Sequence, residues 1–530
     1  MPEIEEFEVI ILGAGINGCG TYRDLCAQGV KCLLIEREDF CAGASAASSR
    51  LMHGGLKYLE TGEFRLVRES LTERNMLLAT APHLVHPLEC VVPVQSVFGG
   101  IVGSVARFLG IKAKLSDRGF LITALGLTLY DIYGRKLQKM PGHRMLGRRA
   151  LHRQMPGLAA NISGAGVYYE GHITHAERLG LELVLDAEAL NKASRSVTHA
   201  EVLWAEGDVI RYRTQTGEAK ARAKVIVNAG GAWIDSVNAL LRINGKLIGG
   251  SRGSHLVIDN PDLLAALGGR MIYFGTADGR VNLIYPFAGK VLVGSTDIPC
   301  ADPDSAVCTD AEADYLRQAV AEVLPAIPIH PHQIVQRFCG VRPLPRSDGA
   351  DIGSVTRDHS ITTLTLPGTV IPILCLIGGK WTTFRGFSEQ ATDAVLGHLG
   401  VTRKVSTAGM AIGGGLGMPG TPQARDALAV DLARQANLSP ARVVVLLSRY
   451  GTRARAILTS LKGQAETPLR HCPNYTLEEI RHICLTERVL TVDDVLRRRT
   501  LITLTGAATA EVRQEVGDIL ASVIQEPLLA

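Results

Sequence analysis

Apolar and polar positions follow a strand, helix and strand pattern over the first 36 residues. FEVIIL (7–12) is an apolar run that leads into Gly13, and KCLLIE (31–36) is a second run that ends at Glu36. The stretch between them has helical character. Short apolar runs bounded by turn residues are typical of buried parallel strands, so the pattern predicts a βαβ unit.

Three further apolar runs lead into small residues, at 223–229 (AKVIVNA), 290–297 (KVLVGSTD) and 372–379 (PILCLIGG). Each predicts a short buried strand followed by a turn. Residues 405–422 are rich in Gly and predict a linker. Beyond it the periodicity becomes helical, in ARDALAVDLARQA, ARVVVLLSRY and TLEEIRHICLTERVL. The pattern therefore predicts an α/β body followed by a helical domain.

Composition narrows the class of protein. The chain has 530 residues and is 46% hydrophobic, enough for several cores. Its 11 Cys are scattered without a C-x-x-C pair, which indicates a reducing cytosolic context with no disulfide framework and no metal site. The acidic start lacks a signal-peptide pattern. No apolar run reaches the ~18 residues needed to cross a bilayer, and no nucleic-acid partner is expected.

Basic charge is concentrated in residues 101–150. Ten Lys and Arg against two acids give this segment +8, whereas the whole chain is +4, so the remainder is −4. Two apolar stretches, VARFLGI (105–111) and FLITALGLTLY (120–130), are interleaved with the basic residues. Basic residues beside an apolar face suit docking on an anionic membrane surface. The alternative is a buried helical pair with a solvated basic rim.

Residues 13–18 match G-x-G-x-x-G, with Gly13, Gly15 and Gly18 at the fixed positions. The first Gly permits the tight turn, the second lets backbone approach a pyrophosphate, and the third allows close packing of helix on strand. Glu36 lies 36 − 13 = 23 residues after the first Gly, near the ~20 expected for a carboxylate that binds ribose hydroxyls. The motif predicts a dinucleotide site; the alternative is an ordinary glycine-rich turn.

The loop that follows distinguishes a flavin from a nicotinamide cofactor. Residues 44–60 contain Ser45, Ser48 and Ser49 and then Gly54 and Gly55. Such a loop can pass close to a flat ring system, and its hydroxyls and amides can bond phosphate or ring edges. An NAD dehydrogenase would not be expected to need it, so FAD is predicted. The alternative for this stretch is a helix cap followed by a turn.

These residues also carry a family resemblance. GINGCG, SSRLMHGGLKYLETGEFRLVRESL, RGSH, GSTD, CGVRPL, TRDHS and GGKWTTFR occur in this order over about residues 7–395. Together they resemble FAD-dependent, quinone-linked glycerol-3-phosphate dehydrogenase. RYGTRARAIL and LEEIRHICLTERVLTVDDVLRRRT resemble the helical domain of that family.

The resemblance implies an α/β fold, with a Rossmann-like FAD-binding domain, an antiparallel-sheet substrate domain and a C-terminal helical domain. The expected division is a discontinuous FAD-binding domain (1–95, 150–245 and 335–400), a basic apolar insertion (96–149), a substrate domain (246–334), a linker (401–423) and a helical domain (424–530).

The resemblance also implies roles for individual residues. Those that would hold the ADP half of FAD are Gly13, Gly15, Asn17, Gly18 and Glu36. Those that would lie along the flavin are Ser48, Ser49, His53, Gly54 and Gly55, and the loop that would close over the ring is Gly378, Gly379, Lys380, Trp381 and Thr382. The substrate cluster would be Arg342, Arg357 and Lys380, with Tyr58, His255 and Thr296 completing its wall. Lys57 stands where family members usually carry Arg.

The implied reaction is oxidation of sn-glycerol 3-phosphate to dihydroxyacetone phosphate by hydride transfer to FAD. Lys57, Arg342, Arg357 and Lys380 would form a cationic clamp for the phosphate and stabilise developing negative charge. His53 or His255 would be the base, with another group or water as the alternative. For each residue the competing interpretation is a surface ion pair or a hydrogen-bonded structural histidine.

Electrons would pass to ubiquinone or menaquinone, with the protein cytoplasmic and peripheral on the inner face of the cytoplasmic membrane. Two alternatives stay open: a soluble oxidase that uses O₂, and a flavoprotein for another anionic hydroxy or amino acid. A non-catalytic flavin-binding scaffold is a third. The sequence also leaves a homodimer open.

Overall fold

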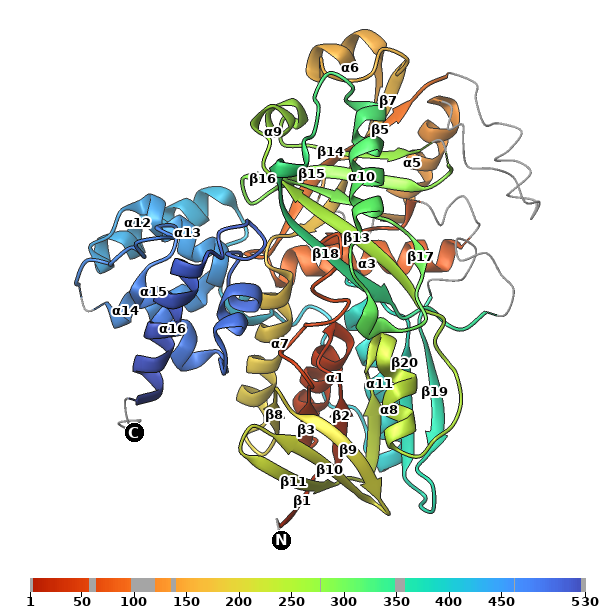
Figure 1. Cartoon of the computed structure of the whole chain (residues 1–530), viewed down its shortest axis with the longest axis vertical. Helices are drawn as coiled ribbons and strands as arrows, with labels where there is room; N and C mark the ends of the chain where they lie inside the picture. The colour runs from red at the N-terminus through yellow and green to blue at the C-terminus, as the bar shows by residue number, and fades with distance from the viewer. Residues whose placement is uncertain are drawn as a thin grey trace.

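The computed structural model describes residues 3–56, 63–96, 120–134, 140–276, 278–347, 358–461 and 463–525. Three of the predicted substrate residues, Lys57, Tyr58 and Arg357, lie outside these ranges, as do seven of the ten basic residues of segment 101–150. The chain forms two large sheet regions and a helical domain at one side (Figure 1). The predicted fold class is confirmed.

A six-stranded sheet forms the centre of the first region. Its order is β19 (Ser360–Thr365), β20 (Pro372–Ile377), β12 (Val225–Asn228), β2 (Val9–Leu12), β3 (Cys32–Ile35) and β8 (Arg195–Val197), and all but the edge strand β19 run parallel. The inner strands are buried on both faces, which explains their continuous apolar sequences.

Alternate residues of β2 enter two different cores. Val9 and Ile11 pack with helices α1 (Ile16–Ala27), α7 (Ala176–Leu190) and α11 (Phe384–Leu399). Ile10 and Leu12 pack on the other face. That face is covered by α8 (Ile234–Leu240) and by a four-stranded sheet, in the order β1 (Ile4–Glu6), β11 (Gly217–Arg222), β10 (Val209–Thr214) and β9 (Glu201–Glu206).

A ten-stranded sheet forms the second region. Its path is β17 (Ile298–Pro299), β13 (Ser251–Ile258), β16 (Lys290–Gly294), β15 (Val281–Phe287), β14 (Met271–Gly275), β5 (Val85–Val94), β7 (Gly164–Ile173) and β4 (Leu51–Met52), with β18 (Ile334–Arg342) on β13 and β6 (Arg144–Gly147) on β7. Its pairs are antiparallel except β14 with β5. Helices α3 (Phe64–Thr80), α5 (Phe120–Gly134), α6 (Arg148–Gln154), α9 (Pro261–Leu267) and α10 (Asp310–Val323) lie around it.

This sheet differs from the predicted division of the chain. Strands β5 and β7 were expected in the FAD-binding domain, and β6 in the insertion, yet all three belong to the second sheet. Nearly all of strand β18 falls in the predicted FAD-binding segment 335–400, but most of the strand pairs with β13 of the second sheet. The sequence of a strand carries little information about its distant partner, so which sheet these strands join was not visible from the sequence.

The C-terminal helices have a core of their own. They are α12 (Pro422–Ala436), α13 (Pro440–Tyr450), α14 (Ala454–Ser460), α15 (Leu477–Thr486) and α16 (Ala510–Gln525), with a π-helical turn at Asp494–Arg499. Thr421, Ser439 and Thr476 accept hydrogen bonds from the first turns of α12, α13 and α15 and fix where these helices begin. Among the described helices, none combines the length and apolarity needed to cross a bilayer.

Candidate active site

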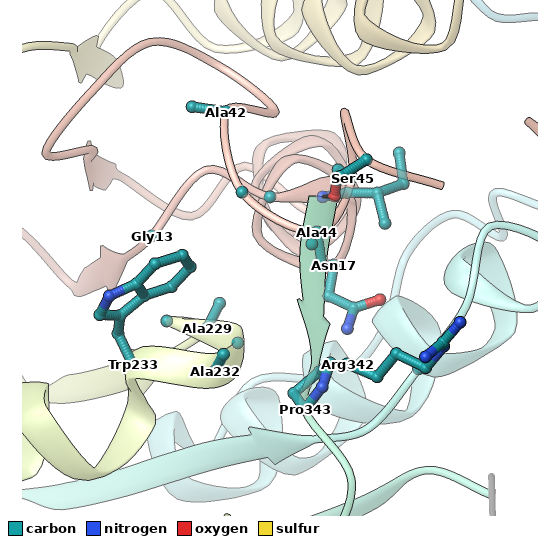
Figure 2. A pocket seen from close by; sticks show the side chains of 18 of the residues that line it. Gly13, Asn17, Ala42, Ala44, Ser45, Ala229, Ala232, Trp233, Arg342 and Pro343 are labelled. Carbon is teal, nitrogen blue, oxygen red and sulfur yellow. Dashed lines mark hydrogen bonds between the residues drawn. The ribbon is translucent and has the colours of Figure 1, made fainter. Parts of the chain in front are cut away.

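A cavity of about 470 Å³ lies between the glycine turn after β2 and the end of β18. Figure 2 shows Gly13, Asn17 and Ser45 on its wall, with Trp233 and Arg342 approaching from other elements. Its lining joins segments from the two sheet regions. The volume is in the range typical of small-molecule and cofactor sites.

The glycine turn has the geometry that its sequence predicts. Gly13 has a φ of +101°, and a Cβ there would lie 2.8 Å from the carbonyl oxygen of Ala229. A Cβ at Gly18 would lie 2.0 Å from the oxygen of Gly13, so helix α1 packs directly on the turn. Gly15 meets only the Ser45 hydroxyl, at 3.4 Å, and it lines the cavity. The backbone is therefore accessible where a pyrophosphate would lie.

Glu36 lines the same cavity at the end of β3. Its carboxylate accepts hydrogen bonds from the backbone N–H of Ala14 at 2.6 Å and of Glu38 at 2.9 Å. Burial raises the pKa of Glu36, against the opposing effect of these two bonds. The two bonds fix the carboxylate at the cavity wall, where it can accept from ribose hydroxyls.

Asn17 joins the first glycine turn to the late Gly378-Gly379 loop. Its Nδ2 donates to the carbonyl oxygen of Gly378 at 3.1 Å across 361 residues of sequence. A Cβ on Gly379 would lie 2.5 Å from the same nitrogen. Both glycines have positive φ, +77° and +92°, so the close approach depends on glycine at these positions.

Ser45 and Trp381 form a second link between these loops. The Ser45 hydroxyl accepts from the N–H of Ile16 at 3.0 Å, and its carbonyl accepts from the Trp381 indole at 3.0 Å. Trp381 and Thr382 are buried and line the cavity, as predicted for the closing loop. Ser45 was expected as one of the hydroxyls of the flavin loop, but its place beside Gly15 was not visible from spacing.

The part of the cavity wall that follows Glu36 is lined by residues that the sequence analysis did not single out. Arg37 lies over the Trp233 ring at 5.0 Å, and Asp304 accepts hydrogen bonds from both side chains at 2.9 Å. Val202 and Leu240 complete this part of the wall. An indole and two aliphatic side chains near the ribose-binding carboxylate suit a flat adenine ring.

Ser49 and His255 meet at the wall near the predicted flavin. The Ser49 hydroxyl lies 2.8 Å from His255 Nε2, and the His255 ring stacks on Phe338 at 5.0 Å. Burial, together with the charges of Arg342 and Arg50, lowers the pKa of His255 to about 3. The ring is therefore neutral at physiological pH. The neighbouring Ser48 hydroxyl accepts from the N–H of Arg50 at 3.1 Å and also lines the cavity.

His53 lines the cavity with a buried carboxylate behind it. Its Nδ1 lies 3.9 Å from Glu170 Oε1. Burial would raise the pKa of Glu170, but contacts with His53 and Arg74 hold it below its usual value. A carboxylate that stays ionised behind an imidazole can orient the ring and stabilise its protonated form.

Gly54 and Gly55 lie behind this wall rather than along it. The Gly54 N–H donates to Glu170 at 2.8 Å, and a Cβ on Gly54 would lie 2.0 Å from the Tyr130 hydroxyl. Gly55 has a φ of +87°, and neither glycine lines the cavity. The geometry requires glycine here for packing and turning, which differs from the expected contact with the flavin.

Arg342 projects from the end of β18 into the cavity lining. Its guanidinium donates to Asp297 at 3.1 Å, to the Ser295 hydroxyl at 2.9 Å and to the carbonyl oxygen of Thr296 at 3.1 Å. These bonds fix a cation at the cavity wall. Thr296 itself is only 1% exposed, its hydroxyl donates to Glu312 at 2.9 Å, and it is not part of the cavity lining.

Lys380 reaches the cavity from the late glycine loop. Its Nζ donates to the Ser70 hydroxyl of α3 at 2.9 Å. Burial lowers the pKa of Lys380 to about 8, although Glu69 and Asp358 oppose the shift. Part of the population is therefore neutral at mildly alkaline pH.

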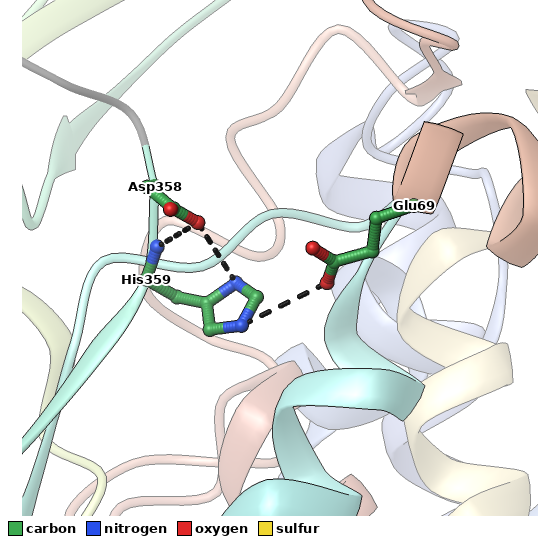
Figure 3. A group of neighbouring side chains, drawn as sticks. All are labelled: Glu69, Asp358 and His359. Atoms are coloured by element: carbon green, nitrogen blue, oxygen red, sulfur yellow. Dashed lines mark hydrogen bonds and ion pairs between the residues drawn. The ribbon is translucent and has the colours of Figure 1, made fainter. Parts of the chain in front are cut away.

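Glu69, Asp358 and His359 lie close together (Figure 3), and the charges of Glu69 and Asp358 act on Lys380. His359 Nε2 lies 3.7 Å from Glu69, whereas Nδ1 lies 3.7 Å from Asp358. The two ring nitrogens face different carboxylates, and Arg65 pairs with both acids. A single ion cannot lie on both nitrogen lone pairs, so this arrangement suits an imidazole held between carboxylates better than a metal site.

The cavity fits FAD on its own geometry. Gly13, Gly18 and Gly379 each lie where a Cβ would meet neighbouring atoms at 2.8 Å or less, and Gly15 exposes backbone to the cavity. Asn17 Oδ1 and His255 Nδ1 are buried without a hydrogen-bond partner in the protein. Glu36, Arg342 and Lys380 all line this cavity.

Comparison with known proteins agrees with this geometry. Residues 8–371 match the family described as FAD dependent oxidoreductase, and residues 405–525 match the C-terminal domain of alpha-glycerophosphate oxidase. The glycerol-3-phosphate dehydrogenase of Synechocystis sp. is 33% identical over 527 residues, which cover 95% of this chain and 90% of that protein. The D-erythritol 1-phosphate dehydrogenase of Brucella abortus is 33% identical over 400 residues, 74% of each chain.

The fold comparison agrees as well. The crystal structure of the glycerol-3-phosphate dehydrogenase from Bacillus halodurans complexed with FAD matches with a TM-score of 0.70 at 21% identity, over 99% of this chain and 96% of that one. The predicted cofactor and family are thereby confirmed: the chain belongs to the FAD-dependent oxidoreductase family, in its glycerol-3-phosphate dehydrogenase group, and FAD is its cofactor.

Proposed function

We propose that the protein oxidises sn-glycerol 3-phosphate to dihydroxyacetone phosphate and passes the electrons to a membrane quinone. One observation carries the substrate assignment: Arg342 and Lys380, from different elements, line one cavity together with both glycine loops. Two cations on the wall of one cavity suit a phosphate dianion. The names of the Synechocystis and Bacillus halodurans relatives support the same substrate.

FAD, when bound, supplies the hydride acceptor. The chain supplies the rest of the chemistry. Arg342, fixed by Asp297, holds the phosphate, and the ammonium of Lys380 stabilises negative charge that develops on the reacting oxygen. His53 accepts the hydroxyl proton, with Glu170 orienting its ring. His255, with its pKa lowered to about 3, is the weaker base and positions Ser49.

The substrate class includes longer polyol phosphates as a second candidate. The relative from Brucella abortus is named for D-erythritol 1-phosphate, and it matches as closely in identity as the Synechocystis protein over a shorter length. The phosphate clamp would serve both substrates. Steady-state kcat/KM for sn-glycerol 3-phosphate, erythritol 1-phosphate and lactate decides between them, because the proposal requires the first to be the best.

The electron acceptor is tested in the same assays. With a short-chain ubiquinone, turnover should exceed turnover in air without quinone, and little peroxide should form. Equal rates with peroxide as the stoichiometric product would assign the soluble oxidase function instead.

Lys380 gives the reaction a predicted alkaline limit. Because burial lowers its pKa to about 8, the ammonium is lost as pH rises, and kcat/KM should fall about tenfold per pH unit above that value. Lys380→Arg keeps the positive charge, so its kcat/KM should no longer fall between pH 8 and about pH 10. Lys290→Arg, at a surface lysine paired with Asp259, is the control. An unchanged alkaline fall in Lys380→Arg would contradict the assignment.

Helix α5 supports attachment to the inner face of the cytoplasmic membrane. Leu121, Leu125 and Ile132 are 48%, 63% and 50% exposed, and their spacing places them on one face of the helix. Leu127 and Tyr130 are buried against the body. An exposed apolar helix face beside a basic segment suits docking on anionic lipids, where a quinone is dissolved.

Leu125→Asp should weaken binding to vesicles of phosphatidylcholine and phosphatidylglycerol by roughly tenfold or more, because a leucine side chain buried in the interface contributes about 1.5–3 kcal/mol. Co-sedimentation at low salt measures this. Val370→Asp replaces an apolar residue that is 93% exposed on another element and should leave binding unchanged. Equal loss in both variants, or no binding of the native protein, would rule out docking through α5.

A further inference from the structure

Residues 36–45 form a loop with two different sides. Glu36, Arg37, Glu38 and Ala42 to Ser45 line the cavity. Asp39, Phe40 and Cys41 lie between them, are nearly fully buried and do not line the cavity. One side of the loop therefore faces the cofactor site and the other faces the interior of the protein.

The buried side is held by the C-terminal helical domain. Arg499, at the end of the π-helical turn, donates to both oxygens of Asp39, at 2.5 Å from Nη1 and 2.9 Å from Nη2. The two side chains are 1% and 5% exposed. The Nε of Arg499 donates to the carbonyl oxygen of Glu487 at 3.0 Å, which fixes the guanidinium within its own domain. A bidentate pair of this kind is directional as well as attractive.

A second contact comes from the same turn. Asp494 accepts from His199 Nε2 at 3.0 Å, and the backbone N–H of His199 donates to the carbonyl oxygen of Glu38 at 2.7 Å. Both contacts come from the π-helical segment Asp494–Arg499. Such segments are rare in proteins, and those that occur often lie at functional sites. The domain thus contacts the loop at Asp39 directly and at Glu38 through His199.

The loop needs external support. Cys41 has a φ of +57°, in the left-handed region that a residue with a Cβ adopts at a cost. Its N–H donates to the oxygen of Ala14, within the glycine turn, at 2.9 Å. The conformation of the loop is therefore tied to the shape of the phosphate-binding turn.

We infer that the C-terminal helical domain is a clamp on the FAD-binding loop, with Arg499 as a positioning residue that holds residues 36–45 in the conformation that receives the ADP half of FAD. Arg499 touches neither FAD nor substrate. It acts through Asp39. When the binding-competent loop is only partly populated, apparent affinity falls in proportion to its population.

The test measures FAD affinity of the full-length apoprotein by quenching of flavin fluorescence. Arg499→Lys keeps the charge but loses the bidentate geometry, and it should raise the dissociation constant of FAD about tenfold, which corresponds to ~1.4 kcal/mol. Arg178→Lys is the matched control. Arg178 forms an equally buried bidentate pair with Glu487 across the same domain interface and also donates to the Arg499 carbonyl, without contacting the loop.

Arg178→Lys should lower the melting temperature by about as much as Arg499→Lys does. Its FAD dissociation constant should stay within twofold of the native value. Asp39→Asn changes the partner of Arg499 on the loop and should weaken FAD binding as Arg499→Lys does. If Arg499→Lys does not fold, the affinity of Asp39→Asn tests the proposal in its place. Equal effects of Arg178→Lys and Arg499→Lys on FAD affinity, or unchanged affinity in both Arg499→Lys and Asp39→Asn, would overturn the clamp.

Discussion

Replacing Arg342 by Met is expected to lower kcat/KM for sn-glycerol 3-phosphate by roughly 30- to 5,000-fold, because removing one partner of a hydrogen-bonded charge pair costs about 2–5 kcal/mol. The guanidinium is fixed by Asp297, Ser295 and the backbone of Thr296, so no reorganisation is needed when the phosphate arrives. Most of the effect should be in KM if the side chain holds the phosphate in ground state and transition state alike. Steady-state kinetics at fixed flavin content measures both parameters.

Two further variants separate this role from a general loss of charge. Arg342→Lys retains the positive charge but not the two-pronged guanidinium. Its kcat/KM should lie between those of Arg342→Met and the native protein. Arg337→Met, on the same strand β18, removes a guanidinium that pairs with Asp310 at the surface and should leave kcat/KM unchanged. An Arg342→Met protein with native kcat/KM, or one that loses FAD instead, would contradict the substrate role.

His53→Asn is expected to lower kcat by about 10²–10⁴-fold with KM little changed, since general-base catalysis contributes in that range. His53 lies on the cavity wall with the ionised Glu170 behind it, whereas His255 is buried and is held neutral with its pKa lowered to about 3. A group with so low a pKa is a weak proton acceptor at working pH. Rapid mixing under anaerobic conditions measures the rate of flavin reduction directly.

His255→Asn is the comparison for His53→Asn. It should disturb Ser49 and the packing on Phe338, and so lower stability more than the rate of flavin reduction. Glu170→Gln should reduce the rate less than His53→Asn, because the imidazole that accepts the proton is retained. A reduction rate in His53→Asn within threefold of the native rate would transfer the role of base to another group.

The local parts of the site were predictable from sequence because their signals are local. The turn requires glycine at Gly13 and Gly18 for steric reasons that spacing reveals, and Glu36 follows at the end of the next strand. The contact between Asn17 and Gly378 spans 361 residues, and only the family resemblance brought these segments together.

The errors and omissions share a cause. Strands β5, β7 and β18 belong to the ten-stranded sheet although their residues fall almost wholly in the predicted FAD-binding segments, because sequence position does not encode a distant strand partner. Ser70 and Glu170 were missed because their roles arise from contacts to Lys380 and His53 that no spacing rule predicts. Thr296 and Gly54 were placed on the cavity by motif alone, yet their immediate partners, Glu312 and Tyr130, lie behind its wall.

Everything proposed for catalysis requires one FAD to lie in the cavity between the two glycine loops, with Arg342 and Lys380 at its reactive end. Anaerobic titration of the reconstituted protein with sn-glycerol 3-phosphate tests this arrangement in a single measurement. One equivalent of FAD per chain should be bleached fully by the phosphate ester and left oxidised by glycerol, lactate and glycine. A chain that stays colourless after incubation with FAD, or a bound flavin that sn-glycerol 3-phosphate does not reduce, would contradict it.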